Sequence, residues 1–163
     1  VPIAEIHGML CYGKNAPITT KLLEEEMPTP FEGGCMCGGV RYRCEAEPGM
    51  TYYCHCEDCR RGSGSAFHVG LGVSKDAVTV LKGEPKSFRK EADSGRGITR
   101  MFCPTCGSPL FTYPDVWPDI VMIKAGSVDE PELFEPNIEI YTDSKVSWAH
   151  IGPTVESYPK GRA

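Results

Sequence analysis

The sequence predicts a mainly β domain with short strands. Few stretches have helical periodicity, residues 40–44 alternate apolar and polar side chains as a half-buried strand does, and glycine-rich turns separate the apolar runs. Tyr141 and Trp148 are expected to be core aromatics. Further strands are predicted at residues 69–73, 78–81, 86–90, 120–125 and 137–141, with 78–81 and 86–90 paired through a turn at 83–85.

One domain is the simplest organisation for 163 residues, because a chain of this length can bury a core without disulfide support. Residues 1–30 are interpreted as an N-terminal extension and residues 31–163 as the domain. Within the extension, residues 21–27 predict a short helix, and Cys11 fits a half-buried small hydrophobe better than a metal ligand.

Charge and hydropathy argue against a nucleic-acid-binding protein and against a membrane protein. The net charge of −5 argues against a nucleic-acid binder, which should show a basic face. The first thirty residues lack a basic start followed by an apolar run, and no apolar stretch approaches the roughly 20 residues needed to cross a bilayer. We therefore expect a cytoplasmic protein with neither nucleic-acid nor membrane partners.

The nine cysteines fall mostly into close pairs, a spacing typical of metal ligation, and their odd number prevents complete disulfide pairing within the chain. Cys103 and Cys106 form a zinc-knuckle signature, Phe-Cys-Pro-Thr-Cys-Gly. Cys35 and Cys37, bracketed by glycine pairs, are the natural partners for a closed four-sulfur site. Cys44 falls on the apolar face of its predicted strand and is expected in the core.

A second group of thiols lies within Cys-His-Cys-Glu-Asp-Cys-Arg-Arg, residues 54–61. On an extended segment Cys54 and Cys56 face the same side, and a turn returns Cys59 to the same point. Three converging sulfurs suit Zn²⁺ and leave one tetrahedral position free. His55 should point away from such a metal.

The residues after these thiols are candidates for binding an anionic substrate. Arg60 and Arg61 either hold substrate carboxylates by paired hydrogen bonds or form a surface pair with Glu57 or Asp58. Ser63 either stabilises the following turn through its hydroxyl group or donates a hydrogen bond to a bound anion.

Three motifs in one order carry a family resemblance: Gly-Gly-Cys-x-Cys-Gly-x-Val-Arg-Tyr, Cys-His-Cys-x-x-Cys-Arg-Arg-x-Ser-Gly-Ser and Phe-Cys-x-x-Cys-Gly-Ser. The sequence resembles the glutathione-dependent formaldehyde-activating enzyme family, which includes the domain found in centromere protein V. The resemblance implies that residues 31–163 form a β-tent-like zinc domain of packed antiparallel sheets with few short helices and two zincs per chain. By motif position, the structural zinc site corresponds to Cys35, Cys37, Cys103 and Cys106, and the catalytic site to Cys54, Cys56 and Cys59.

The resemblance also implies an activity, the condensation of glutathione with formaldehyde by a carbon–sulfur lyase acting in the synthetic direction. We expect a substrate thiol, glutathione or a similar molecule, to bind as a thiolate at the open position of the three-cysteine site. There it would add to formaldehyde or another small carbonyl compound. Arg60, Arg61 and Ser63 would bind the substrate and offset the negative charge of three thiolates on one Zn²⁺.

Two alternative functions follow from the same cysteines. In a binding or scaffold module both zincs would be structural, and the fourth ligand of the second site would come from His55, Cys44, Cys11 or a distant residue. In a thiol redox protein Cys56 and Cys59 would form a disulfide, which tight zinc binding would suppress.

Overall fold

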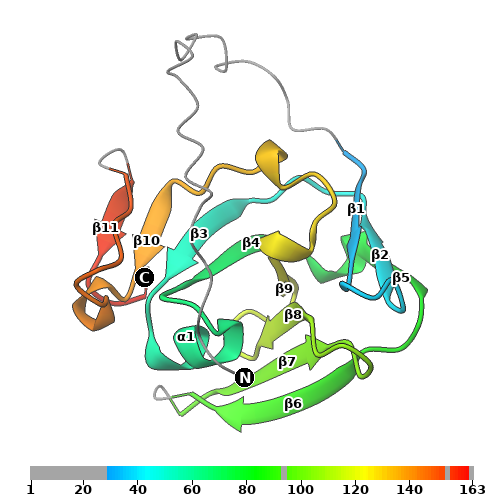
Figure 1. Ribbon diagram of the computed structural model, residues 1–163, viewed down its shortest axis with the longest axis horizontal. Coiled ribbons are helices and arrows are strands. Elements are labelled where there is room, and N and C mark those ends of the chain that lie inside the picture. The colour runs from blue at the N-terminus through cyan, green and yellow to red at the C-terminus, as the bar shows by residue number, and fades with distance from the viewer. Residues whose placement is uncertain (1–28, 93–94, 153–154, 162–163) are drawn as a thin grey trace, which may run out of the picture.

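The computed structural model describes residues 29–92, 95–152 and 155–161, which form two β-sheets (Figure 1). The smaller sheet has the strand order β1-β2-β5, and the larger has the order β11-β10-β3-β4-β9-β8-β7-β6. One α-helix, α1 (Glu57–Ser63), follows β3. The strands are β1 (Phe31–Gly34), β2 (Arg41–Cys44), β3 (Met50–Cys54), β4 (His68–Ser74), β5 (Val78–Lys82), β6 (Lys86–Glu91), β7 (Gly97–Phe102), β8 (Pro109–Pro114), β9 (Ile120–Lys124), β10 (Ile138–Ile140) and β11 (Glu156–Tyr158).

The smaller sheet packs against one face of the larger sheet through a shared apolar core. Tyr42 and Cys44 are fully buried on β2, as the alternation of this strand predicts. The ring of Tyr42 packs edge-to-face on Phe111 of β8, with 4.9 Å between the ring centroids. Val121 and Ile123 of β9 belong to the same core. The expectation that Cys44 is a core residue is therefore confirmed.

The opposite face of the larger sheet carries a second apolar cluster. Successive side chains along a strand point to opposite faces, so Met122 lies on this second face of β9. It packs in one cluster with Tyr52 and Cys54 of β3. The second face is where the functional candidates described below are found.

The mainly β class is confirmed, with one difference in strand direction. The larger sheet is mixed, because β10 runs parallel to both β3 and β11. Parallel neighbours need a connection of about a dozen residues or more. Both connections satisfy this requirement, since α1 and strands β4 to β9 separate β3 from β10, and residues 141–155 separate β10 from β11.

The predicted pairing of residues 78–81 with 86–90 is wrong. Both segments are strands, but β5 pairs with β2 and β6 pairs with β7. Gly83, with φ of 75°, lies where the chain passes from one sheet to the other. A Cβ atom at Gly83 would lie 2.1 Å from the carbonyl oxygen of Gly39. This connection therefore packs against the β1–β2 loop and does not close a hairpin.

The two aromatic residues predicted in the core near the C-terminus, Tyr141 and Trp148, differ in burial. Trp148 is 68% exposed, so its prediction as a core residue is wrong. Tyr141 is partly buried against the second apolar cluster and adopts a left-handed backbone conformation with φ of 59°. It follows β10 directly and faces the cavity described below.

The predicted helix at residues 21–27 and Cys11 lie outside the described residues. Within residues 29–92, 95–152 and 155–161, no helix has the length and apolar character required to span a membrane.

Gly33 allows a test of the packing between β1 and the segment after β9. A methyl group there would lie 2.3 Å from the hydroxyl oxygen of Tyr42 and 2.4 Å from the carbonyl oxygen of Ser127. We expect Gly33→Ala to lower the free energy of unfolding by about 1–3 kcal/mol in a urea titration. Gly49→Ala is the control, because no heavy atom lies within 4 Å of its Cβ position. Equal losses in the two variants would contradict the close approach at Gly33.

Candidate metal centres and the adjoining cavity

Four cysteines from two loops converge at one end of the larger sheet. Cys35 and Cys37 follow β1, and Cys103 and Cys106 lie between β7 and β8. Their sulfur atoms all lie within 4.8 Å of one another. The Cys35–Cys37 and Cys37–Cys103 sulfur distances are 3.5 and 3.7 Å. The backbone N–H of Val40 donates a hydrogen bond to Cys35 Sγ.

These distances fit a tetrahedral metal site. Four sulfurs bound at about 2.3 Å to one Zn²⁺ would lie about 3.8 Å apart. Gly38 and Gly107 have φ values of 68° and 73°, and each follows the second cysteine of its pair. Such left-handed glycines let the two loops fold tightly around a common centre. The cluster is therefore suited to hold a metal with four protein ligands.

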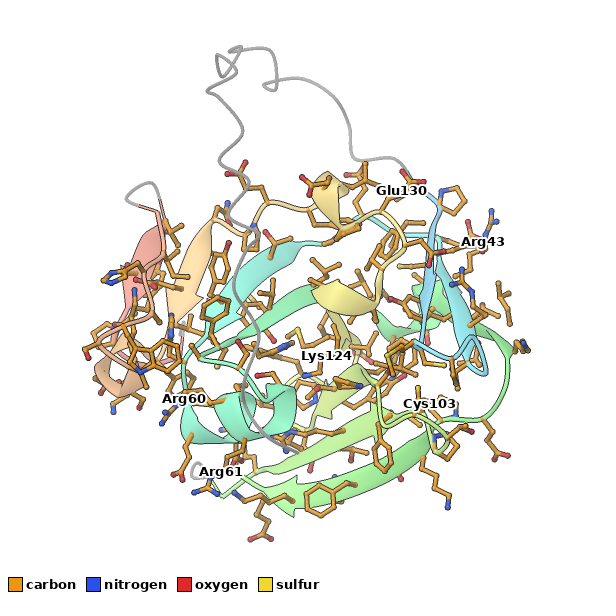
Figure 2. All side chains as sticks on the ribbon, viewed as in Figure 1. Arg43, Arg60, Arg61, Cys103, Lys124 and Glu130 are labelled. Atoms are coloured by element: carbon orange, nitrogen blue, oxygen red, sulfur yellow. The ribbon has the colours of Figure 1, made fainter. Side chains whose placement is uncertain are left out.

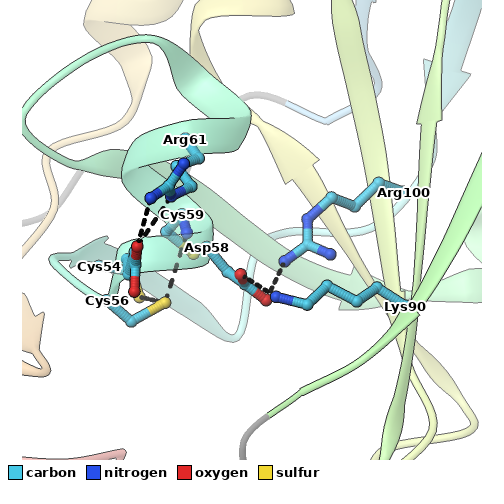
Figure 3. Close-up of polar contacts among 8 residues, drawn as sticks. Cys54, Cys56, Asp58, Cys59, Arg61, Lys90 and Arg100 are labelled. Carbon is cyan, nitrogen blue, oxygen red and sulfur yellow. Dashed lines mark hydrogen bonds and ion pairs between the residues drawn. The ribbon is translucent and has the colours of Figure 1, made fainter.

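Three further cysteines converge where β3 meets α1 (Figure 3). Cys54 ends β3, Cys56 is the N-cap residue of α1, and Cys59 lies in its first turn. The sulfurs of Cys54 and Cys56 are 3.6 Å apart, and all three lie within 4.8 Å of one another. The backbone N–H of Cys59 donates to Cys56 Sγ at 3.4 Å. The expected two-residue turn is thus the start of a helix, which ends at Gly64 with φ of 68°.

The three-cysteine cluster lacks a fourth protein ligand within the described ranges. No other His, Cys, Asp or Glu there has a ligand atom within 4.8 Å of all three sulfurs. Cys44 Sγ donates to the carbonyl oxygen of Ala46 in the core, and His55 contacts Glu139. Two of the three named candidates for a fourth ligand are therefore engaged elsewhere, and the third, Cys11, lies outside the described residues.

His55 fixes the segment between Cys54 and Cys56. It is fully buried, with Nε2 3.1 Å from Glu139 Oε2, and its backbone N–H donates to the carbonyl oxygen of Ile140. Lys145 and Ser157 also donate to the Glu139 carboxylate, at 2.8 and 2.7 Å. Burial lowers the pKa of His55, and the three hydrogen bonds hold the pKa of Glu139 below its ordinary value although burial raises it. The network ties this segment to β10 and β11.

A cavity of about 220 Å³ opens beside the three cysteines. It lies over the second face of the larger sheet, with walls from β3, β7, β8 and β9. Most of its wall is apolar, and the polar groups come from few residues. Its apolar lining includes Met50, Tyr52, Ile98, Trp117, Met122 and Ile140.

Lys124 and the buried His68 form a partly buried polar contact in the cavity wall. Lys124 Nζ lies 3.4 Å from His68 Nε2. Burial, opposed by the nearby thiols, lowers the pKa of Lys124 to about 8, and burial together with the Lys124 charge lowers the pKa of His68 to about 3. At neutral pH His68 is therefore uncharged and can accept a hydrogen bond from the Lys124 ammonium.

Asp58 is the carboxylate that lines the cavity. Its two oxygens lie 2.6 Å from Lys90 Nζ and 3.5 Å from a guanidinium nitrogen of Arg100, as Figure 3 shows. Arg100 is largely buried, with a side chain 16% exposed. Two cations therefore neutralise this carboxylate and connect α1 to β6 and β7.

Comparisons with known proteins identify the family. The profile of the family described as glutathione-dependent formaldehyde-activating enzyme matches residues 30–144. This chain belongs to that family. A protein of Halomonas elongata named "Putative glutathione-dependent formaldehyde-activating enzyme" is 30% identical over 129 residues, which cover 74% of this chain and 80% of that protein. A crystal structure of a Rhodobacter sphaeroides protein shares the fold at 20% identity, with a TM-score of 0.52 over 64% of this chain and 96% of that chain.

In this family member Arg60, Arg61 and Ser63, which are predicted to bind the substrate, lie on α1 and outside the cavity lining. Arg61 is exposed and bonds Glu57 at 2.7 Å, and Arg60 has a buried Nε with no hydrogen-bond partner among the described residues. Ser63 Oγ donates to the carbonyl oxygens of Arg60 and Phe67. Ser63 also lines a separate cleft of about 550 Å³, which shares His68 and Lys124 with the cavity.

Sequence reasoning missed the polar residues of the cavity. Figure 2 shows Lys124 near the middle of the molecule and Arg60 and Arg61 on α1 at its edge. Lys124 ends the apolar run of β9 and continues the face of Met122, while Arg100 continues the face of Ile98 on β7. A charge that continues one face of an apolar strand is the signal that could have found both residues.

The two cysteine clusters should differ in their effect on stability. We expect Cys103→Ser to lose one metal per chain and to unfold or severely destabilise the domain, since a structural zinc contributes on the order of 10 kcal/mol to folding. Cys56→Ser should lose the other metal with the fold largely intact, because serine also serves well as an N-cap residue. Thermal melts with metal analysis by mass spectrometry test this, and equal stability losses would contradict the division.

The Glu139 network provides a second test. Glu139→Gln removes the charged acceptor of His55 and Lys145, so we expect the free energy of unfolding to fall by about 1–3 kcal/mol. Glu57→Gln is the matched control, because Glu57 is exposed and its pair with Arg61 should contribute less than about 1 kcal/mol. Urea titrations of both variants are the measurement. A loss at Glu139 no larger than the loss at Glu57 would argue against an anchoring role.

Proposed function

We propose that this protein is a zinc-dependent carbon–sulfur lyase that joins a thiol, such as glutathione, to formaldehyde or another small carbonyl compound. The observation that carries the proposal is the three-cysteine cluster, which faces a cavity and has no fourth ligand among the described residues. The family assignment supports the same chemistry through its described activity. A small-molecule thiol is accordingly the proposed partner.

In the proposed arrangement Cys35, Cys37, Cys103 and Cys106 hold one structural zinc, and Cys54, Cys56 and Cys59 hold a catalytic zinc. A zinc with three thiolate ligands leaves a coordination position for a substrate thiol and keeps that thiol deprotonated at neutral pH. Clustered free thiols suit a reducing compartment, so we place the protein in the cytoplasm.

The chain's own residues would bind and position the reactants. The apolar walls around Tyr52 and Met122 exclude water from the substrate sulfur. The sulfur lone pair forms the S–C bond as the C=O π bond breaks, and the carbonyl oxygen then takes one proton. The Lys124 ammonium and the Tyr52 hydroxyl are cavity groups that carry a proton. Lys124 also offsets the negative charge of the sulfurs.

Arg60, Arg61 and Ser63, predicted from the motif to bind the substrate, lie outside the cavity lining and would act on the substrate from outside the cavity. Ser63 lines the adjoining cleft and would contact the part of a long thiol that extends there. Arg60 and Arg61 lie on the helix that carries Cys59, so their charges would attract anionic substrates towards the cavity.

A scaffold function would need a fourth protein ligand for the second metal. Within the described ranges His55 and Cys44 make other contacts, which favours the open site over a filled one.

The proposed activity can be measured as exchange of formaldehyde between water and thiol. With ¹³C-formaldehyde and a thiol panel that includes glutathione, exchange spectroscopy should show faster formation and breakdown of the S–CH₂–OH group in the presence of the protein. Cys56→Ser should return exchange to the uncatalysed rate. Cys44→Ala is the matched cysteine control and should retain catalysis, because Cys44 belongs to neither cysteine cluster and its thiol donates to the carbonyl oxygen of Ala46. Uncatalysed rates with every thiol and carbonyl compound would refute the proposal.

A further inference from the structure

Lys124 is a partly buried cation in the cavity wall, and it has no carboxylate within ion-pair distance in the described part of the chain. Its contact there is the uncharged His68, with 3.4 Å between the nitrogens. Buried charges in proteins are normally paired or bound to a ligand. The cysteine sulfurs supply nearby negative charge. They do not form an ion pair with the ammonium as a carboxylate would. The ammonium is therefore available to bind an anion that enters the cavity.

Two further polar groups lie on the same face of the larger sheet. Arg100 of β7 is the register partner of Thr112 of β8, and Thr112 is the register partner of Met122 of β9. Lys124 is the next residue on the Met122 face. Thr112 Oγ1 is buried and has no hydrogen-bond partner among the described residues. Three adjacent strands thus present two cations and an unpaired hydroxyl to the cavity.

The apolar part of the cavity wall favours a substrate with an apolar body. Met50, Ile140 and Tyr141 pack in the same apolar cluster as the three cysteines. Ile98 and Trp117 line the cavity as well. An apolar group on the substrate would be removed from water here, which contributes about 25 cal/mol per Å² of buried surface.

The cavity also disfavours an ammonium group on the substrate, because Arg96 is a further cation in its lining. Asp58 is the carboxylate in the described lining, and Lys90 and Arg100 already neutralise it. A substrate ammonium would find no acceptor of opposite charge and would face Lys124. Pockets for drug-sized ligands measure about 300–1,000 Å³, so a volume of about 220 Å³ suits a molecule smaller than a tripeptide.

We propose that the thiol accepted by this cavity is a compact apolar thiol with a single carboxylate, which Lys124, Arg100 and Thr112 bind. This assignment rests on the proposed function and narrows its substrate class. It makes glutathione, a tripeptide that carries an ammonium group, a poor ligand of the cavity.

Binding can be followed without turnover through Trp117. The chain has two tryptophans, and Trp148 is exposed, so Trp148→Phe leaves Trp117 in the cavity wall as the fluorescent reporter. The full chain with its bound metal is titrated with 2-mercapto-3-phenylpropanoate, 2-phenylethanethiol, mercaptoacetate and glutathione. These ligands separate the apolar body from the carboxylate. We expect the first to bind about tenfold or more tighter than the other three, since a charge-assisted hydrogen bond contributes about 1.5–3 kcal/mol.

Lys124→Met, in the same background, tests the anchor. It should weaken binding of 2-mercapto-3-phenylpropanoate about tenfold and leave 2-phenylethanethiol within about twofold. The fold should tolerate this change, because it replaces a partly buried ammonium with an apolar side chain of similar length. Lys86→Met on β6 is the matched control and should change neither affinity, since Lys86 is exposed and outside the cavity lining. If the lysine variant fails to fold, the affinities of 2-mercapto-3-phenylpropanoate and 2-phenylethanethiol for the Trp148→Phe protein still test whether the carboxylate contributes to binding.

Two outcomes would overturn the proposal: glutathione binding as tightly as the phenyl acid, or Lys124→Met weakening acid and neutral thiols equally. Tight binding and turnover of glutathione would leave the proposed function standing and would mean that the larger adjoining cleft is used. Selective binding of the phenyl acid without formaldehyde exchange for any thiol would support the ligand class and refute the proposed reaction.

Discussion

The alternation of side chains along β9 and its neighbours is the constraint on which the rest of the structure depends. Val121 and Ile123 face the smaller sheet and build the main core, while Met122 and Lys124 face the cavity. A shift of one residue in the register of β9 would exchange these two sets. The same strands therefore provide the main apolar core on one face and the walls of the candidate site on the other.

The three-cysteine cluster depends on a second coupling, between a strand end and a helix start. Cys54 ends β3, and Cys56 caps α1 while its sulfur accepts the N–H of Cys59. The buried contact of His55 with Glu139 holds the residue between the two first sulfurs on β10. Because both ends of the segment and its centre are fixed by other elements, the sulfurs can converge before a metal binds, which reduces the entropy lost on binding.

The sequence predicted well what its short motifs determine locally. The two close cysteine pairs, the three-cysteine cluster and the direction of His55 away from those three sulfurs follow from spacings of a few residues and from strand alternation. It failed where the outcome depends on distant partners. The turn at 83–85 resembles a hairpin connection. The strand before it, β5, nevertheless pairs with β2, and the strand after it, β6, pairs with β7. Lys124 and Arg100 could not be grouped with the cysteines, because the sheet order that places them together comes from pairing across the whole chain.

This division between local and distant determinants separates metal binding from substrate choice. The seven ligand candidates lie in three compact motifs, which are also the motifs that identify the family. The cavity walls come from residues spread between Met50 and Gly161, most of them on different strands, and these include the cations and apolar side chains that a substrate would meet. Changes in the walls can therefore alter which thiol fits while the cysteines remain in place. The cysteine motifs of the family are accordingly compatible with more than one thiol, and under the proposals made above the charge and apolar surface around Lys124 would specify the ligand in this chain.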